Sequence, residues 1–324
     1  MKLLIIGGSG FIGKHLIKYL FKKYPGYEIV NMDKLSYQHD MDSMEEIVGD
    51  HKYKFVEGDI RDSKIIQPLV NDAEVIINLA TSLRFDSDGS FLTTDIVGTF
   101  NLLEAIRKDK IRKLIHVSDY VVYGDSVIEK DAAKLFTETD SLNPMTPGAA
   151  SKSGSDRLAY SYYLTYETPV TILRCANNFG PYQYPTKLIP FFIIQALEGK
   201  KLPIHGEGKH MRDWIYVEDQ VEAIDYVLHG KNTNGQVYNI GASCEKSVLE
   251  VTELILTIMD RSKDLIDFVK EPVGHTQRRS IDVSKIRTEL GWQAKWNFNE
   301  AMEQTIDWYI KNHRWWEKLL GENK

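Results

Sequence analysis

Three glycines follow the first apolar run of the chain, at Gly7, Gly10 and Gly13. When such glycines stand between a strand and a helix, the first permits a tight turn and the second lets the backbone approach a pyrophosphate, while the third lets the helix pack on the sheet. The helix would begin near Phe11 and Ile12, and its N-terminal N–H groups would face the phosphates. The segment therefore predicts a dinucleotide-binding loop, the alternative being a glycine-rich turn without a ligand.

Acidic and small residues after the next apolar runs extend this prediction. Asp33 ends the second run, about 20 residues after the glycines, where a carboxylate can accept both hydroxyls of a ribose. It would repel a 2′-phosphate by ~4 kcal/mol at 4 Å and an effective dielectric of about 20, so NAD is expected rather than NADP. Asp59 and Ile60 are expected to meet the adenine, and Leu79 and Ala80 to line the same site.

The elements that must position these residues alternate between strand and helix. Strands are predicted at residues 2–6, 28–33, 54–57, 74–79, 113–118 and 170–175, with helices at 11–24, 91–108 and 149–166 between them. Most of the strands are apolar on consecutive positions, which is typical of strands buried on both faces of a parallel sheet. The alternation predicts an α/β fold with a doubly wound parallel sheet (Rossmann) and right-handed crossovers.

The pattern changes after residue 178. Segments rich in glycine and proline surround helices predicted at residues 187–198, 217–228 and 298–312. We interpret residues 1–177 as an NAD-binding lobe, to which the chain returns around residues 212–241. Residues 178–324 would form a smaller, mixed α/β lobe that binds the substrate.

Composition excludes several classes of function for these 324 residues. The formal net charge of −6 disfavours a nucleic-acid-binding surface, which needs basic patches. No apolar run is long enough for a membrane span or a secretory signal, so a cytoplasmic protein is expected. Cys175 and Cys244 lack the paired spacing of a zinc site or a disulfide framework, so neither a metal nor a disulfide is expected.

Several motifs resemble a known family. The GxxGxxG spacing at residues 7–13 resembles extended short-chain dehydrogenases/reductases, and later segments are similar to the nucleotide-sugar branch, most closely to dTDP-glucose 4,6-dehydratases. The similar segments are NMDKLSY at 31–37, GTFNLLEA at 98–105, NNFGPYQ at 177–183, KLIP at 187–190, LPIHG at 202–206, RDWIYV at 212–217 and YNIG at 238–241. The resemblance covers nearly the whole chain, and it implies a Rossmann fold that binds NAD.

The resemblance also implies a nucleotide-diphosphate sugar as substrate. By position, the residues expected at the pyrophosphate and the neighbouring sugar are Asn178, Lys187, Arg212 and Asn239. Those expected at the nucleotide base are Pro203, Ile204 and His205. The other residues expected to bind the substrate are Arg84, Leu188 and Arg278. An arginine and a lysine converging from separate segments suit a doubly charged diphosphate. Taken alone, each cation would more simply be a solvated surface charge.

The catalytic positions depart from the family pattern. The family's Tyr-x-x-x-Lys has Gly148 in place of the tyrosine, while Lys152 is retained. In the family's Ser-Thr-Asp-Glu-Val-Tyr-Gly, the catalytic hydroxyl is replaced by Asp119, the dehydrating acid by Tyr120 and the dehydrating base by Val121. Valine cannot take a proton, and losing one positioned base costs ~10² to 10⁴ in rate. Ordinary 4,6-dehydration is therefore not expected.

Hydride transfer at C4 remains feasible if another group replaces the missing tyrosine. Tyr120 is the favoured base, because Lys152 and the positive nicotinamide would lower the pKa of a nearby phenol below about 10. Asp119 is the second candidate, since it is a carboxylate already able to take a proton. The alternative is that both residues only pack at the end of the strand. Lys152 is expected to bind the nicotinamide ribose in each case.

The sequence thus predicts an NAD-dependent enzyme that oxidises C4 of a nucleotide-activated hexose or heptose to a 4-keto sugar without dehydration. Reduced cofactor would be released, or reoxidised by a second oxidant such as a small keto acid. The alternatives are a 4-epimerase, an atypical 4,6-dehydratase, and a non-catalytic protein that binds NAD and a nucleotide sugar. Family habit predicts a homodimer or homotetramer, and the substrate class suggests capsular polysaccharide synthesis.

Overall fold

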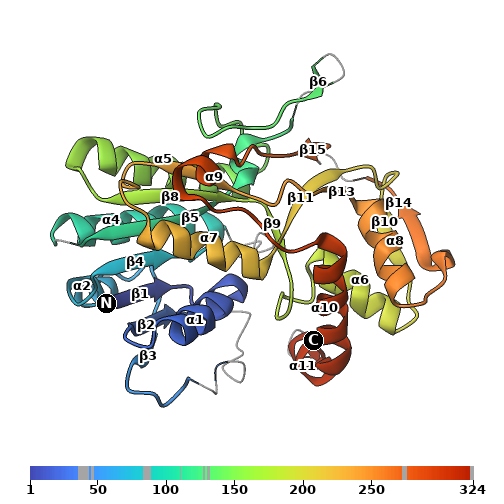
Figure 1. The fold of residues 1–324 in the computed structure, drawn as a ribbon, viewed down its shortest axis with the longest axis horizontal. Helices are drawn as coiled ribbons and strands as arrows, with labels where there is room; N and C mark the ends of the chain where they lie inside the picture. The colour runs from blue at the N-terminus through green and yellow to red at the C-terminus, as the bar shows by residue number, and fades with distance from the viewer. Residues whose placement is uncertain are drawn as a thin grey trace.

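The computed structural model describes residues 1–35, 44, 47–82, 89–109, 111–126, 128–129, 132–271 and 276–321. Its main sheet has seven parallel strands in the order β12-β8-β5-β4-β1-β2-β3 (Figure 1). The strands are β1 (Lys2–Ile6), β2 (Glu28–Asp33), β3 (Tyr53–Glu57), β4 (Val75–Asn78), β5 (Lys113–Asp119), β8 (Val170–Cys175) and β12 (Val237–Ile240). The predicted doubly wound parallel sheet is confirmed.

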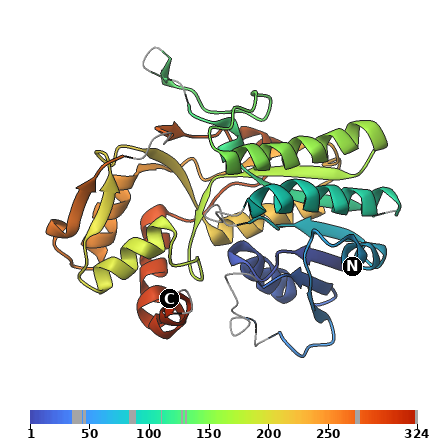
Figure 2. The same ribbon diagram turned by 180° about the vertical axis from the view of Figure 1, so that it is seen from behind.

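Helices cover both faces of this sheet. They are α1 (Phe11–Lys23) and α7 (Val217–His229) on one face, and α2 (Ser63–Asn71), α4 (Thr99–Arg107) and α5 (Pro147–Tyr166) on the other (Figures 1 and 2). In α1 the buried positions Leu16, Ile17 and Leu20 form one apolar stripe against the sheet. Burying each such side chain contributes ~1.5–3 kcal/mol, which is what holds the phosphate loop's helix in place.

The strand order places a crevice at β1. Its neighbours are β2 on one side and β4 on the other, so the chain winds outward in both directions from this point. Open α/β sheets bind ligands at such a switch point, outside the carboxyl ends of the strands. The residues after β1, β4 and β5 are therefore the ones that the fold brings together.

A second lobe packs beside this sheet with its own apolar core. Its strands are β9 (Asn177–Phe179), β10 (Leu202–His205), β11 (Met211–Tyr216), β13 (Glu245–Ser247), β14 (Ile266–Val269) and β15 (Arg278–Arg279). Its helices are α6 (Leu188–Leu197), α8 (Val248–Ile258), α10 (Phe298–Lys311) and α11 (His313–Gly321). The short remaining elements are β6 (Ile128–Glu129), β7 (Ala132–Ala133), α9 (Ser284–Leu290) and two 3₁₀ helices, Tyr120–Tyr123 and Lys263–Leu265.

The chain passes between the two lobes more than once. β12 pairs with β8 at the edge of the main sheet, and α7 packs on α1. Ile281, Ile286 and Trp292 are buried in the first lobe's core as well, beyond the single return that the sequence suggested. The division at residue 177 stays a prediction, and α7 and β12, which follow it in the chain, belong to the layers of the main sheet.

The helix predicted at residues 91–108 is not one α-helix. The chain forms α3 (Ser90–Leu92), then a π-helical segment at Thr93–Gly98, and then α4. Gly98 lies so close to Ile60 that an added Cβ would meet its Cγ2 at 2.5 Å. Thr94 and Asp95 are buried in this π-helical segment. The sequence pattern of a regular helix did not predict their burial. π-Helical segments occur frequently at functional sites.

Candidate functional site

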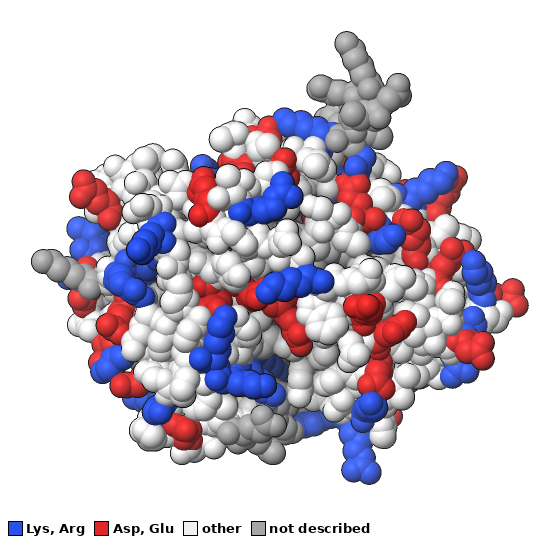
Figure 3. Space-filling view, in the orientation of Figure 1, with Lys and Arg blue, Asp and Glu red and all other residues white. Residues whose placement is uncertain are grey.

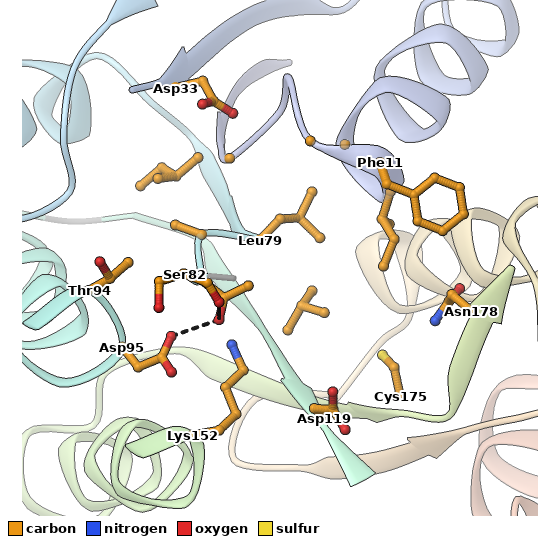
Figure 4. Close-up of a pocket in the computed structure, with 18 of the residues that line it drawn as sticks. Phe11, Asp33, Leu79, Ser82, Thr94, Asp95, Asp119, Lys152, Cys175 and Asn178 are labelled. Atoms are coloured by element: carbon orange, nitrogen blue, oxygen red, sulfur yellow. Dashed lines mark hydrogen bonds between the residues drawn. The ribbon is translucent and has the colours of Figure 1, made fainter. Parts of the chain in front are cut away.

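A cavity of about 460 Å³ lies at the carboxyl ends of β1, β4 and β5, within the usual size range of ligand pockets (Figure 4). The sequence-predicted residues that line it are Gly7, Gly10, Phe11, Ile12, Gly13, Asp33, Asp59, Ile60, Leu79, Ala80, Asp119, Lys152, Asn178, Lys187 and Leu188. All the residues predicted for the cofactor are thus brought to one cavity. Those predicted for the substrate are only partly brought there.

The glycine loop between β1 and α1 is packed too closely for side chains. Gly7 has a φ of +79°, and a Cβ there would lie 2.9 Å from the backbone nitrogen of Ala80. A Cβ on Gly13 would lie 2.5 Å from the Cα of Gly8. Gly10 caps α1 without any side-chain hydrogen bond, so no cap competes with a phosphate for the N–H groups of the first turn.

Two carboxylates at the strand ends are held by local hydrogen bonds. Asp33 accepts from the backbone N–H groups of Ser9 at 3.0 Å and Leu35 at 2.9 Å, which fixes it at the mouth of the glycine loop. Burial tends to raise the pKa of Asp59, but its hydrogen bonds and ion pair with Arg61 outweigh burial and hold that pKa below its usual range. The Asp59 carboxyl is therefore an anion at neutral pH.

Four buried polar atoms of the cavity wall have no hydrogen-bond partner in the described part of the chain. They are the hydroxyl oxygens of Ser82, Thr94 and Ser118 and the amide oxygen of Asn178. An unsatisfied buried polar group costs about 1–3 kcal/mol, so such a concentration indicates a polar ligand that completes these bonds. Together with the glycine loop and Asp33, these atoms fit a dinucleotide.

The start of α5 brings Gly148 and Lys152 to the cavity, one helical turn apart. Thr146 caps this helix by accepting from the N–H of Ala149 at 3.2 Å, and Pro147 occupies the first turn, where its missing N–H is tolerated. Lys152 is buried, and among the described residues its ammonium donates no hydrogen bond. Figure 4 shows its side chain extending into the cavity beside Asp95.

The structure separates the two candidate bases. Asp119 ends β5, lines the cavity, and accepts from the N–H of Val121 at 2.8 Å, which caps the following 3₁₀ helix. Tyr120 turns the other way into the core, with no exposed surface and with the Arg279 guanidinium 5.1 Å from its ring centre. Burial raises the pKa of Tyr120 in this structure, and the lowering expected beside a bound nicotinamide stays a prediction. Of the two, Asp119 is the residue at the cavity.

Two arginines predicted for the substrate lie outside the cavity lining, on neighbouring strands of the second lobe. Arg212 donates to the carbonyl oxygens of Met211 at 2.7 Å and Thr276 at 2.8 Å. Arg278 forms an ion pair with Glu245. Their role toward a substrate stays a prediction. Arg84 lies outside the described residues.

Asn239 and the predicted base-binding residues are also away from the cavity. Asn239 is fully buried; its amide nitrogen donates to the carbonyl of Phe136 at 2.8 Å, and its amide oxygen accepts from Tyr123 at 2.7 Å. These hydrogen bonds tie core elements together, and contact of Asn239 with a substrate stays a prediction.

The residues of the LPIH segment, which forms β10, alternate between the core and the outer side of the strand. Ile204 is fully buried in the second core, so only its backbone could meet a base, and that contact stays a prediction. Pro203 is half-buried and His205 is exposed, with Nδ1 3.3 Å from the carbonyl of Lys270. Contact of Pro203 and His205 with a nucleotide base stays a prediction.

The cavity also contains residues that sequence reasoning missed. Asp95 is buried and accepts from the hydroxyls of Thr81 at 2.9 Å and Ser151 at 3.2 Å. No sequence signal indicated Asp95, because the π-helical segment that turns it inward has no recognisable pattern. Cys175, at the end of β8, could have been found by its place at a strand's carboxyl end. Burial raises the pKa of its thiol to about 12, so it is not a thiolate at neutral pH.

Basic and acidic side chains are interspersed over the described surface seen in Figure 3, without a continuous basic stripe on that face. Within the described ranges, no group of three or more His, Cys, Asp or Glu residues could hold a metal ion. A search of the same ranges finds no helix with the length and apolarity that crossing a bilayer requires.

Comparisons with known proteins agree with this architecture. The family model described as GDP-mannose 4,6 dehydratase matches residues 4–305. The low-salt glycan biosynthesis protein Agl12 of Haloferax volcanii is 41% identical over 314 residues, covering 96% of this chain and 99% of that protein.

Two solved structures are similar over almost the full length. The dTDP-glucose 4,6-dehydratase of Bacillus anthracis, in complex with NAD, has a TM-score of 0.91 and 40% identity, covering 98% of this chain and 99% of that one. The UDP-glucuronic acid 4-epimerase of Bacillus cereus, in complex with UDP-glucuronic acid and NAD, has a TM-score of 0.89 and 28% identity, covering 96% and 99%. The chain therefore belongs to the GDP-mannose 4,6 dehydratase family, and its fold is the one shared by nucleotide-sugar dehydratases and epimerases.

Proposed function

We propose that this protein binds NAD and a nucleotide-diphosphate sugar and oxidises the C4 hydroxyl of the sugar to a ketone without removing the C6 hydroxyl. The observation that carries the proposal is the composition of one cavity wall: Asp119 and Lys152 line it beside Gly148. Tyr120 and Val121 stand at the positions that the resemblance gives to the dehydrating acid and base. Both residues are buried, and neither lines the cavity. This supports one oxidation step and leaves the elimination step without its expected groups.

In this proposal each polar group of the wall has one task. The Asp119 carboxylate takes the proton of the C4 hydroxyl, and its hydrogen bond from the Val121 N–H fixes its orientation. The Lys152 ammonium binds the hydroxyls of the nicotinamide ribose. NAD, when bound, supplies the hydride acceptor. The hydroxyl oxygens of Ser82 and Ser118, which have no partner among the described residues, accept hydrogen bonds from ligand hydroxyls or amides.

The two reducing equivalents taken from the sugar must also leave the protein. The reduced cofactor is either released or reoxidised by a small keto acid, which becomes the corresponding hydroxy acid. The two routes differ in a simple measurement. Release consumes one NAD for each sugar oxidised, whereas a keto acid allows many turnovers with a catalytic amount of NAD.

The test is to incubate the purified protein with NAD and a panel of nucleotide-diphosphate hexoses and heptoses, with and without a keto acid. We expect reduced-nicotinamide absorbance without the keto acid, and a 4-keto sugar that retains its C6 hydroxyl by mass spectrometry. A 4-keto-6-deoxy product would show a dehydratase, and a product inverted at C4 an epimerase. Binding of NAD and nucleotide sugar without any product would support the non-catalytic alternative.

A further inference from the structure

The 180–187 loop, which connects β9 to α6, carries cavity-lining side chains. Gln183 and Lys187 belong to this loop, and Asn178 stands just before it on β9. Gln183 donates through Nε2 to the carbonyl of Asn178 at 2.7 Å, so its side chain and the backbone of Asn178 are coupled. The position of the loop therefore decides where Gln183 and Lys187 stand beside Asn178.

The loop contains a residue in an uncommon backbone conformation. Tyr182 has a φ of +63°, in the left-handed region that non-glycine residues seldom occupy. Such a conformation persists only where surrounding contacts hold it.

Aromatic side chains from the end of the chain enclose the Tyr182 ring. Its centre lies 4.4 Å from that of Trp308 on α10 and 5.7 Å from that of Trp315 on α11. On α1, the ammonium groups of Lys18 and Lys14 lie 5.3 Å and 5.7 Å from the same ring centre. The ring is thus held between the C-terminal helices and the helix that follows the glycine loop.

Two hydrogen bonds fix the backbone on either side of Tyr182. The hydroxyl of Tyr309, a fully buried residue of α10, donates to the carbonyl oxygen of Gln183. His15 Nε2, on α1, lies 2.9 Å from the carbonyl oxygen of Pro181. Burial lowers the pKa of His15 to about 4, so the ring is neutral near pH 7 and can donate this bond as its Nε2–H tautomer.

α10 packs beside α6, the helix that the loop enters, at the junction of the two lobes (Figures 1 and 2). From these contacts we infer that Tyr309, together with Trp308 and Trp315, positions the 180–187 loop for the diphosphate of the substrate. These are positioning residues, since none of them lines the cavity. The inference rests on the proposed function, because it takes the ligand of this wall to be a nucleotide diphosphate.

The test removes only the hydroxyl that fixes Gln183. Tyr309→Phe is compared with Tyr238→Phe, a matched control in which another buried tyrosine loses a single hydrogen bond, to Glu289 at 2.8 Å. Isothermal titration is done on the full chain with NAD and with ADP, GDP, CDP, UDP and dTDP as probes. The unfolding temperature is recorded for each variant.

We expect Tyr309→Phe to bind the nucleoside diphosphate about tenfold more weakly than the wild type. Its NAD affinity and unfolding temperature should match those of the control. Equal nucleoside-diphosphate affinities for the wild type and Tyr309→Phe would overturn the inference, as would an equal loss in Tyr238→Phe. A purely structural role would lower the unfolding temperature and both affinities together. Wild-type protein that binds none of the five probes would overturn the proposed function as well.

A second pair of variants tests the aromatic contact by itself. Trp308→Phe keeps a ring against Tyr182, whereas Trp308→Leu keeps apolar volume without a ring. We expect the phenylalanine variant to retain nucleoside-diphosphate affinity and the leucine variant to lose it to the extent of Tyr309→Phe. Equal affinities in the two variants would contradict a role for the ring.

Discussion

At the scale of single residues, the turn after β5 decides which side chain can take a proton in this cavity. Asp119 uses one carboxylate oxygen to cap the 3₁₀ helix that follows, and this cap directs Tyr120 into the core. The buried phenol has no hydrogen-bond partner among the described residues, and burial raises the pKa of Tyr120. Its raised pKa disfavours the phenolate, and Tyr120 does not line the cavity.

The first prediction compares the two residues directly. Asp119→Asn should reduce the oxidation rate by ~10² to 10⁴, because an amide of the same shape cannot take the proton. NAD affinity should not change, since the amide retains an oxygen that can accept from Val121. Steady-state kinetics and titration with NAD check both statements.

The companion variant is Tyr120→Phe, which should keep the wild-type rate. Its unfolding temperature should be no lower than that of the wild type, since an unpaired buried hydroxyl stabilises nothing. A rate loss in Tyr120→Phe alone would contradict the assignment of Asp119 as the base.

At the scale of elements, the strand–glycine loop–helix unit at the N-terminus combines two separate constraints. Gly13 is needed for packing, since its Cα faces backbone atoms of Gly8. Gly10 is not crowded in the same way, because a Cβ there would meet only the carbonyl oxygen of Gly7, at 3.2 Å. The two glycines therefore serve the fold and the ligand respectively.

The second prediction separates these constraints. Gly13→Ala should destabilise the fold by about 1–3 kcal/mol, because the backbone must move to admit the methyl group. Gly10→Ala should unfold near the wild-type temperature but bind NAD on the order of tenfold or more weakly, since its methyl group meets the pyrophosphate. Thermal unfolding and titration with NAD distinguish the two. Wild-type NAD affinity in Gly10→Ala would mean that no phosphate approaches this position.

At the scale of the whole molecule, one buried histidine links stability to pH. His116 lies within β5, almost fully buried, with Nδ1 3.3 Å from the amide nitrogen of Asn78 and Nε2 3.4 Å from the hydroxyl of Ser155. Burial first, and then the nearby charge of Lys152, lowers the pKa of His116 to about 3. The folded protein therefore holds this ring neutral.

The third prediction follows from that pKa. Below pH 6.5 the unfolded chain binds a proton that the native chain does not, so stability falls as pH drops from about 6.5 toward 3. At pH 5 the loss is ~2 kcal/mol at 1.36 kcal/mol per unit. The free energy of unfolding is measured in urea at pH 7 and pH 5. Between these two pH values, His116→Gln should lose about 2 kcal/mol less stability than the wild type. Identical pH dependence in the two proteins would contradict the assignment.

The expected oligomer is also a property of the whole molecule. α4 and α5 pack together, and apolar side chains of this region remain exposed: Leu92, Val97, Phe100, Leu164 and Tyr166. The fourth prediction is that sedimentation gives at least twice the mass of one chain, and that Phe100→Glu with Leu164→Glu shifts it to the mass of one. A wild-type monomer would contradict the prediction of a homodimer or homotetramer.

The sequence by itself determined the features that depend on neighbouring residues. Apolar runs with β-rich composition gave the strands of the main sheet, and the glycines between strand and helix located the phosphate loop with Asp33 opposite it. Such patterns are local, because each follows from the backbone freedom of glycine or the burial of one strand. The expectation that Gly148 stands where the family has its tyrosine likewise came from the sequence alone.

Only the tertiary structure decided which of the remaining polar groups face the cavity. Asp119 and Tyr120 are adjacent in the chain, yet one lines the cavity and the other is in the core. The side chain of Asn239 forms hydrogen bonds with core residues, while Asp95 is buried within a π-helical segment. These outcomes depend on contacts between residues far apart in the sequence, and the direction of a side chain at the end of a strand is set by how the chain leaves it.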